Sequence, residues 1–261
     1  MVTTRILSWY ARLASKPPFS ALNDMLLKAA LRGRGYNGSG GFRDSGEDFF
    51  LSNVLAKAHP AVCLDVGANV GRYSEQLLVH TQARVISFEP LPWACERLQA
   101  RLQAFGERSV VVPKGVADAS GRLTLHHNPA SPQLASFSQE VDRISFVNNH
   151  RSLEVDVVTL DDYLQSHPCD DVSFIKIDTE GYEGEVLKGA AMSLLKYRPR
   201  FIQIEFNRHQ LFRDRSLLWF AERLPDRDVY QLIPDGWVRR DPTDPLANIF
   251  EFSNFVFVQR G

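Results

Sequence analysis

The sequence predicts an α/β fold, a doubly wound domain with a mostly parallel sheet. From residue 62 onward, short apolar runs of strand length alternate with segments of helical periodicity, which is the pattern of βα units. A glycine-spaced turn, LDVGANVG at 64–71, joins the first of these runs to the first helix. Carboxylates follow several of the apolar runs, and in such a sheet ligands bind beyond the carboxyl ends of the strands. We therefore expect a binding site at that edge of the sheet.

The elements are predicted from apolar periodicity, in chain order. Helices are expected at 2–13, 20–31 and 48–59, before the sheet begins. The sheet and its connections follow as strands 62–65, 84–88, 109–112, 172–177 and 200–205, with helices 72–80, 92–105, 183–197 and 216–224. Alternating apolar and polar residues predict antiparallel or edge strands at 122–126 and 152–158, separated by a loop at 127–150, with a short helix after Thr159. Two late strands, 230–233 and 255–258, are expected to be joined by a turn at Pro234–Gly236 and a loop.

Length and composition predict one large domain with a terminal extension. The chain has 261 residues, of which 44% are hydrophobic and 23% charged, as in ordinary globular proteins. We assign residues 46–261 to the domain and residues 1–45 to the extension. The formal net charge of −1 gives no support for nucleic-acid binding. The three cysteines contain no C-x-x-C pair, so we expect neither disulfides nor a zinc site, and a cytoplasmic location is the default.

The N-terminal extension is basic and amphipathic. Residues 1–43 carry seven basic side chains against one acidic, a balance of +6. Ile6, Trp9 and Leu13 fall on one face of the first helix, which we expect to pack on the domain; peripheral contact with an anionic membrane or a partner is the alternative. The apolar stretch is too short and too interrupted for a signal peptide or a membrane span. The glycine-rich stretch 33–41 is expected to be a flexible linker or a mobile lid.

The glycine-spaced turn has the form of a nucleotide-binding junction. Gly67 and Gly71 permit backbone angles and a close ligand approach that a side chain would forbid, while the first amides of the next helix are free to donate hydrogen bonds. Asn69 stands where a dinucleotide-binding G-x-G-x-x-G motif has its second glycine, so a pyrophosphate would be crowded there. With Asp65 beside it, the turn suits a cofactor that has a cationic or amino-acid end.

Further carboxylates are expected at the same edge of the sheet. Glu89 ends the second strand, 24 positions after Asp65, where a carboxylate accepts hydrogen bonds from ribose hydroxyls; alternatively, it caps the following loop. Asp118 follows the third strand and is either a partner for the amine of a base or a turn residue. Asp178 follows a strongly apolar strand, which favours a partly buried site residue over a solvated acidic loop.

Five motifs together resemble those of a known family. They are LDVGANVGRYS, ISFEP, GVAD, VTLDDYL and IKIDTEGYEGEVLKGA, and their order resembles that of the FkbM family of S-adenosylmethionine-dependent methyltransferases. The resemblance covers roughly residues 46–257 and implies a Rossmann-like, seven-stranded sheet with an antiparallel last strand. It also implies S-adenosyl-L-methionine as cofactor and methyl transfer to a hydroxyl of a saccharide or a polyketide-type natural product. Nothing follows from it for the first 45 residues.

The resemblance also implies roles for individual residues. The glycine turn would surround the methionine part of the cofactor, Glu89 would hold the ribose, Asp118 the adenine, and Ser136 would lie near the sulfonium. The predicted cofactor-binding residues are Asp65, Gly67, Ala68, Asn69, Gly71, Tyr73, Glu89, Pro90, Val116, Asp118, Ser136 and Asp178.

Methyl transfer to a hydroxyl requires an aligned acceptor and benefits from a general base. The predicted catalytic residues are Asp178, Glu205 and His209, the last two by their position in IEFNRHQ after a strand. The alternative, which the sequence supports equally, is that Glu205 orients a loop and His209 is a surface residue. Asp178 and Glu205 would also suit a hard cation, but without a clear third ligand no metal site is predicted.

The acceptor is predicted only by class, as a small molecule or glycan with hydroxyl groups. Segments 33–48, 127–150 and 207–215, with their histidines, asparagines and arginines, are expected to shape its pocket. Two other functions stay open. One is a nicotinamide-dependent oxidoreductase, which needs a turn that tolerates a pyrophosphate; the other is a non-catalytic module that binds the cofactor without turnover. The oligomeric state is not predicted.

Overall fold

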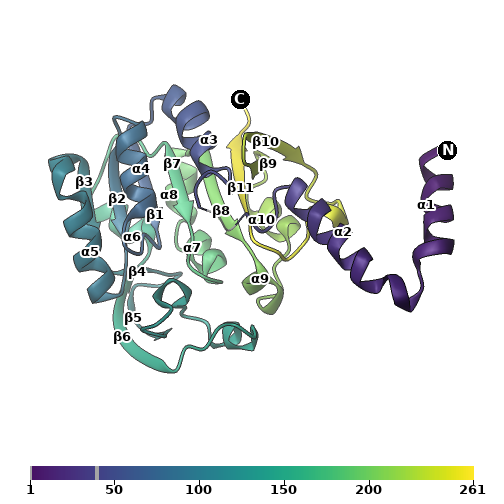
Figure 1. Ribbon diagram of the computed structural model, residues 1–261. Helices are drawn as coiled ribbons and strands as arrows, with labels where there is room; N and C mark the ends of the chain where they lie inside the picture. Colours follow the sequence, from purple (N-terminus) through teal and green to yellow (C-terminus); the bar gives the residue numbers. More distant parts are fainter. Residues whose placement is uncertain (1, 39–40) are drawn as a thin grey trace.

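The body of the protein is an eight-stranded sheet with helices on both faces (Figure 1). The computed structural model describes residues 2–38 and 41–261. In spatial order the strands are β10 (Gly236–Arg240), β9 (Arg227–Ile233), β11 (Ser253–Gln259), β8 (Phe201–Phe206), β7 (Phe174–Ile177), β1 (Val62–Val66), β2 (Arg84–Phe88) and β3 (Ser109–Val112). The pairs from β8 to β3 are parallel, whereas β11 runs antiparallel to both β8 and β9. The predicted α/β fold with a reversed last strand is confirmed.

One sheet strand was not predicted. The turn at Pro234–Gly236 does not lead toward the last strand but closes a hairpin, in which β10 pairs antiparallel with β9. This hairpin adds an eighth strand at the edge of the predicted seven. Its residues alternate weakly and include two adjacent arginines, so periodicity alone gave little signal for a strand.

The two faces of the sheet bury two separate apolar cores. On one face, side chains such as Leu64 and Ile86 pack with α6 (Leu160–Ser166), α7 (Glu183–Lys188) and α10 (Leu217–Arg223). On the other, Cys63 and Val85 pack with α4 (Arg72–His80), α5 (Pro92–Leu102) and the helical segment that begins at α3 (Glu47–Phe49). Every residue of β1 is buried, as expected for a central strand covered on both sides.

Three helical predictions need correction. The segment predicted at 48–59 is helical, but it begins at Glu47 and Phe50–Leu55 form a wider π-helical turn. The helix predicted at 183–197 is two helices, α7 and α8 (Ala191–Tyr197), which separate at Gly189. A Cβ on Gly189 would lie 2.0 Å from the carbonyl oxygen of Ala117, so the close approach of that chain requires glycine there. Helix α9 (Arg208–Phe212) follows β8 and was not predicted.

A small second sheet lies below the carboxyl edge of the main sheet (Figure 1). It contains β4 (Gly115–Val116), which was not predicted, β6 (Arg151–Val158) and β5 (Gly121–His127). Of the two alternatives for the last two strands, antiparallel or edge, the structure shows that they pair antiparallel with each other. Between them, the loop region carries a short 3₁₀ turn at Gln139–Arg143. This sheet and its loop form one wall of the site described below.

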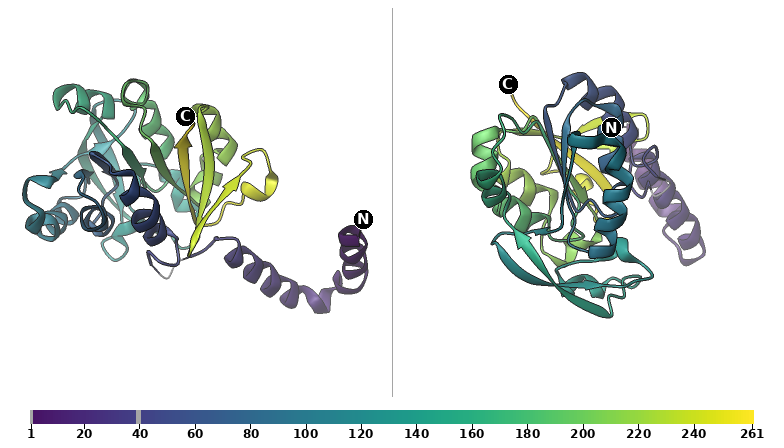
Figure 2. Two further views of the ribbon diagram at one scale, coloured as in Figure 1. Left: turned by 90° about the horizontal axis from the view of Figure 1, so that it is seen from above. Right: turned by 90° about the vertical axis from the view of Figure 1, so that its left-hand side faces the viewer.

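The N-terminal helices α1 (Val2–Ala14) and α2 (Ser20–Gly33) extend away from the body (Figures 1 and 2). The expectation that the first helix packs on the domain is wrong, because its apolar face is exposed: Trp9 is 67% exposed. The chain rejoins the body at Tyr36, which is fully buried, and at Asn37, whose N–H donates to the carbonyl of Phe252. The rest of the predicted linker includes residues 39–40, which lie outside the described residues. Within the described part of the chain, no helix is long and apolar enough to cross a membrane.

Candidate active site

The glycine turn after β1 packs tightly against the end of β7. Gly67, Asn69 and Gly71 all have positive φ angles, of 85°, 49° and 81°. A Cβ on Gly67 would lie 1.8 Å from the carbonyl oxygen of Asp178, a separation that no side chain permits. The turn is therefore pressed onto the segment that carries Asp178, and it needs glycine for packing as well as for conformation.

Asp65 is fully buried beneath this turn. Its Oδ2 accepts a hydrogen bond of 2.5 Å from Ser74 Oγ, which is 2.8 Å from Ser87 Oγ. Its Oδ1 has no hydrogen-bond partner among the described residues. Burial raises the pKa of this carboxyl. Asp65 therefore supports the turn from beneath and lines neither of the two pockets described below.

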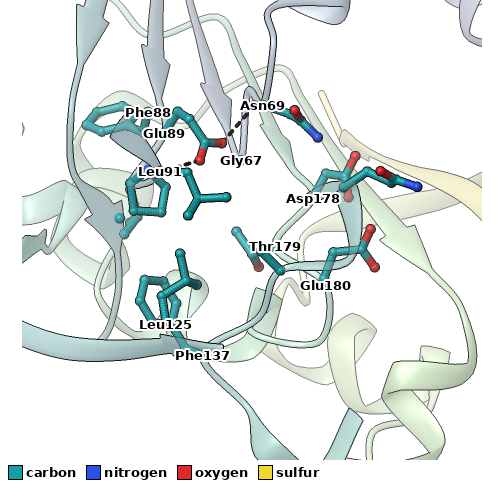
Figure 3. Close-up of a pocket in the computed structure, with 15 residues that line it drawn as sticks. Gly67, Asn69, Phe88, Glu89, Leu91, Leu125, Phe137, Asp178, Thr179 and Glu180 are labelled. Atoms are coloured by element: carbon teal, nitrogen blue, oxygen red, sulfur yellow. Dashed lines mark hydrogen bonds between the residues drawn. The ribbon is translucent and has the colours of Figure 1, made fainter. Parts of the chain in front are cut away.

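Glu89 forms the cap that the sequence offered as its alternative role. It is almost buried, with Oε2 accepting from Asn69 N and Oε1 from Leu91 N, both at 2.8 Å (Figure 3). It therefore caps both the glycine turn and the loop after β2, and it also lines the main pocket. Burial raises the pKa of Glu89 to about 7. Each of its oxygens keeps a second lone pair for a further donor.

A pocket of about 670 Å³ opens between the main sheet and the small sheet. Glu89 and Asn69 lie at one end, Asp178 and Glu180 at one side, and the apolar side chains Leu125 and Phe137 come from the small sheet and its loop (Figure 3). The predicted cofactor residues that line this pocket are Gly67, Asn69, Glu89, Pro90, Val116 and Asp178.

An adjoining pocket of about 1190 Å³ shares Gly67, Asn69 and Asp178 with the first and is also lined by Ala68 and Tyr73. Four predicted cofactor residues line neither pocket. Asp65 and Gly71 support the turn from behind, Ser136 is buried, and Asp118 is exposed. The sequence therefore located the glycine turn and Glu89 correctly as neighbours in space, while the structure gives Asp118 no contact with either pocket.

Three carboxylates meet across from the glycine turn. Oxygen atoms of Asp178, Glu180 and Glu205 all lie within 4.8 Å of one another. Burial, followed by the charge of Asp178, raises the pKa of Glu180 and of Glu205 well above the ordinary value. Asp178 is also held by Lys176, whose Nζ is 2.6 Å from Oδ2. Two of these carboxylates were predicted catalytic residues, and the structure brings them together.

Glu180 is the site residue that sequence reasoning missed. It lies in the DTEGYE run, but nothing in the sequence separates it from its acidic neighbours. In the structure it has a positive φ of 52°, which is uncommon for a residue that is not glycine. Strained backbone of this kind clusters at functional sites. The conformation turns its carboxylate toward Asp178 and the pocket (Figure 3).

His209 and Ser136 both act on Glu180 from behind. His209 is only 3% exposed and does not line either pocket; its Nδ1 is 3.1 Å from Glu180 Oε2. Burial lowers the pKa of His209 to about 4, so the ring is neutral at physiological pH. Ser136 Oγ donates a hydrogen bond of 2.7 Å to the backbone oxygen of Glu180. The structure thus places both predicted residues beside the acidic cluster but gives neither a surface in the pocket.

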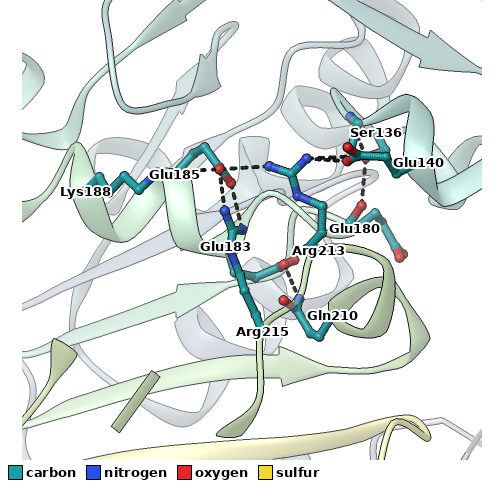
Figure 4. Close-up of polar contacts among 10 residues, drawn as sticks. Ser136, Glu140, Glu180, Glu183, Glu185, Lys188, Gln210, Arg213 and Arg215 are labelled. Atoms are coloured by element: carbon teal, nitrogen blue, oxygen red, sulfur yellow. Dashed lines mark hydrogen bonds and ion pairs between the residues drawn. The ribbon is translucent and has the colours of Figure 1, made fainter. Parts of the chain in front are cut away.

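Charged side chains beneath the pocket hold the DTEGYE segment in place (Figure 4). Glu183 accepts hydrogen bonds from the backbone N–H groups of Thr179 and Gly181 at the start of α7. Arg213 and Arg215 both pair with Glu185. Two of the arginines expected to shape the acceptor pocket are therefore committed to ion pairs that support the segment, and neither lines the two pockets.

A second buried polar network on the adjoining pocket was not predicted. Tyr73 donates to Gln203 Oε1 at 2.6 Å, and Gln203 Nε2 donates to Glu47 at 2.9 Å. The Nζ of Lys176 lies 4.8 Å from the centre of the Tyr73 ring, and neighbouring carboxylates raise the pKa of Lys176 although burial opposes this. The network joins the helix at Glu47 to the central strands β7 and β8, so the N-terminal part of the domain forms part of the site wall.

Comparison with known proteins identifies the family. The model of the methyltransferase FkbM domain matches residues 65–229, which is more than half of the chain. The chain belongs to the FkbM methyltransferase family. The match covers the glycine turn, Glu89 and all three carboxylates of the acidic cluster. The family expectation drawn from the five motifs is confirmed.

Characterised relatives are distant methyltransferases. The chain is 23% identical over 194 residues to the 2-O-methyltransferase NoeI of Sinorhizobium fredii, covering 70% of this chain and 75% of that protein. It is 26% identical over 150 residues to the hexuronic acid methyltransferase AglP of Haloferax volcanii, covering 57% and 58%. Among solved structures, an O-methyltransferase from Bacillus cereus in complex with SAH aligns over the full length of both chains, with 11% identity and a TM-score of 0.47.

S-adenosylmethionine is the methyl donor of FkbM methyltransferases, and the residues of this site fit it. The turn at Gly67 leaves its backbone open to a ligand, Asp65 Oδ1 lacks a donor, and Glu89 lines the same pocket. The apolar side chains Leu91, Leu125 and Phe137 provide a wall suited to a base. The turn and Glu89 would hold the amino-acid end and the ribose of this donor, the apolar wall would hold the adenine, and Asp65 would support the turn from beneath.

Proposed function

We propose that this protein transfers the methyl group of S-adenosyl-L-methionine to a hydroxyl of a saccharide or a related polyhydroxylated metabolite. The observation that carries the proposal is the pair of carboxylates Asp178 and Glu180 in the same pocket as the glycine turn, with Glu205 next to them. A sulfonium methyl is already electrophilic, so this chain's task is to hold an acceptor oxygen in line with it and to remove a proton. Within this proposal, residues 46–261 form the methyltransferase domain and residues 1–45 a separate extension.

Glu180 and Asp178 are the groups placed to receive the proton, because both line the pocket. A general base works best when its pKa is near the operating pH, and the raised pKa of Glu180 moves this carboxyl in that direction. Glu205 lies behind the pair, with Oε1 accepting from Asn207 Nδ2. Burial, and then the charges of Asp178 and Glu183, keep the pKa of Glu180 high, and Glu205 is close enough to share the proton once it is transferred.

Several features support a hydroxylated acceptor. Carboxylates accept hydrogen bonds from hydroxyl groups, and three of them converge here with little cationic compensation. Two distant relatives are described as a 2-O-methyltransferase and a hexuronic acid methyltransferase. A nicotinamide-dependent oxidoreductase loses its support, since the chain belongs to a methyltransferase family.

The test combines binding with transfer. Calorimetric titration with S-adenosylmethionine is expected to show a single site, and labelled cofactor is expected to methylate members of a panel of glycans and hydroxylated metabolites. The position of the methyl on oxygen is then read by NMR of the product. Absence of binding heat would contradict the proposal, whereas binding without transfer across the whole panel would favour a non-catalytic module.

A further inference from the structure

The acidic cluster has more carboxylates than the neighbouring cations can balance. Lys176 forms an ion pair with Asp178, but no Lys or Arg in the described part of the chain lies within ion-pair distance of Glu180 or Glu205. Several unbalanced carboxylates in one partly buried place either share protons or bind a cation. The distances between the carboxylate oxygens indicate which of these two properties the cluster is suited for.

The distances suit a divalent cation. Oxygen ligands at metal distances of about 2.0–2.6 Å from a six-coordinate ion lie about 3–5 Å from one another. The cluster places one oxygen from each of three residues within 4.8 Å of the others. The sequence lacked a third ligand beside Asp178 and Glu205, and the structure supplies it as Glu180.

His209 is a second observation that points to the same place. It is 3% exposed, and neither ring nitrogen has a hydrogen-bond partner among the described residues. Its Nδ1 nevertheless lies 3.1 Å from Glu180 Oε2, so the ring is aimed at the cluster. A neutral imidazole so placed orients a ligand carboxylate, as it does beside many metal sites. Asn207 does the same for Glu205 through Nδ2, at 2.5 Å.

We propose that Asp178, Glu180 and Glu205 bind one divalent cation of the Mg²⁺ or Mn²⁺ class, which in turn binds adjacent hydroxyls of the acceptor. Three protein oxygens leave coordination positions open for substrate, and the bound cation favours the deprotonated hydroxyl. This inference deepens the proposed function and rests on it for the role of the cation, while the cation site itself rests only on the cluster.

The test measures Mn²⁺ alone on the full chain after treatment with a chelator. Electron paramagnetic resonance of free Mn²⁺ is expected to show one bound ion per chain. Glu180→Gln and Glu205→Gln are each expected to weaken this binding at least tenfold. Glu251→Gln is the control, because that carboxylate pairs with Arg208 and lies outside the cluster. Calorimetry with S-adenosylmethionine on every variant separates loss of the cation site from loss of the fold or of cofactor binding.

The outcomes are distinct. Stoichiometric Mn²⁺ binding that falls in both cluster variants, with cofactor binding retained, supports the cation site. Failure of the wild-type protein to retain Mn²⁺ while it still binds S-adenosylmethionine overturns it and leaves the proposed function standing. Mn²⁺ binding that is equal in all variants places the ion elsewhere and also overturns it.

The N-terminal arm, residues 2–33, supports a second and independent inference. Its two helices expose an unusually large set of apolar side chains, whereas monomeric proteins rarely expose large contiguous apolar patches. The exposed residues are Ile6, Leu7, Trp9, Tyr10, Leu13, Phe19, Leu22, Met25, Leu26 and Leu27. The Asn23 side chain donates to the carbonyl of Ala14 at 3.0 Å and accepts from the hydroxyl of Tyr10, so the two helices are joined to each other.

The net charge of the arm indicates which class of partner it contacts. Residues 2–33 carry five basic side chains against one acidic, a balance of +4, whereas the remaining 25 basic and 30 acidic side chains leave −5 for the rest of the chain. A basic helix with exposed Trp and Leu residues matches an anionic lipid surface, in which the apolar face enters the headgroup boundary and the cations contact phosphates. We infer that the arm docks the protein on an anionic phospholipid membrane.

Vesicle co-sedimentation tests this inference on the full chain. Binding is expected for vesicles of equal parts phosphatidylglycerol and phosphatidylcholine, and it is expected to fall at least tenfold for pure phosphatidylcholine or for Ile6→Ser with Trp9→Ser. Met192→Ser with Leu195→Ser is the matched control, since these two side chains are 68% and 73% exposed on α8. Light scattering of the wild-type protein tests the alternative, in which the arm contacts a second copy of this chain. A dimer that the arm variant abolishes, without vesicle binding, would assign the arm to a second copy of this chain and overturn the lipid inference.

Discussion

The two sides of the pocket are built in different ways. The cofactor side, from Asp65 to Glu89, comes from one βαβ unit whose carboxylates have donors close by: Glu89 accepts from two backbone amides and Asp65 from the Ser74 hydroxyl. The acceptor side brings Asp178, Glu180 and Glu205 together from the ends of two strands, with few donors to spare. One side is a local structure that fits a ligand, and the other is an assembly of unbalanced charge.

This difference separates binding from chemistry. Carboxylates with fixed donors, such as Glu89, are suited to recognition because their geometry is set before the ligand arrives. Carboxylates crowded against one another have strongly raised pKa values, and such groups are suited to accept protons or cations. Changes on the acceptor side should therefore reduce turnover, and changes on the cofactor side should reduce affinity or stability.

The largest effect is expected from Asp178→Asn. The substitution removes a charge beside the reacting oxygen and leaves Lys176 without its 2.6 Å partner. We expect kcat to fall by about 10²–10⁴, with the affinity for S-adenosylmethionine changed much less. Steady-state kinetics and calorimetry on the same preparation check this. Loss of affinity in proportion to kcat would show that the two sides of the pocket are not separable.

Gly67→Ala is expected to disrupt the cofactor side of the pocket through a clash with the backbone. Its Cβ would lie 1.8 Å from the carbonyl oxygen of Asp178, so either the turn or β7 must shift. We expect a loss of about 3 kcal/mol or more in the free energy of unfolding, together with loss of cofactor binding. Gly71→Ala is the matched comparison, since its Cβ would meet the end of the flexible Leu98 side chain, at 2.5 Å.

Denaturant unfolding of both glycine variants provides the measurement. Gly71→Ala retains the strain of a positive φ angle of 81° but avoids the backbone clash, so its loss of stability should be clearly smaller. Equal losses for the two variants would show that conformation alone, and not the contact with β7, explains the need for glycine at Gly67.

The same contrast explains how much the sequence could predict. The turn, Glu89 and the parallel strands are encoded within short windows, and the structure places them as expected. The role of Glu180 depends on a positive φ angle and on contacts with β8, neither of which a local pattern contains. The ion pairs of Arg213 and Arg215 could not be predicted, because their partner Glu185 lies 28 and 30 positions away in the sequence. Both arginines were therefore expected at the acceptor. The first helix was expected to pack because amphipathicity does not identify the partner of an apolar face.

A pH effect of intermediate size is expected from Glu89. Burial raises its pKa from an ordinary 4.5 to about 7, so folding favours the protonated form. Its contribution to stability is therefore fully present below pH 4.5 and is lost as the pH rises through 7, amounting to about 1–3 kcal/mol. Unfolding of the cofactor-free wild type and of Glu89→Gln across this range measures it. The difference between the two curves should change by that amount, and parallel curves would contradict the assignment.

The smallest effect tests whether the acidic side depends on support from the small sheet. Ser136 Oγ donates 2.7 Å to the backbone oxygen of Glu180 and also accepts from Ser138 N, so Ser136→Ala frees a strained loop at one point. Of the two hydrogen bonds lost, only the one to Glu180 bears on the acidic cluster, and a hydrogen bond is worth about 1 kcal/mol, so we expect kcat to fall about three- to tenfold with little change in cofactor affinity. Ser120→Ala, in the turn before β5 and bonded to Asp162 and Thr159, is the control. A fall in cofactor affinity with unchanged kcat would instead place Ser136 on the cofactor side, beside the sulfonium, as the family resemblance implies.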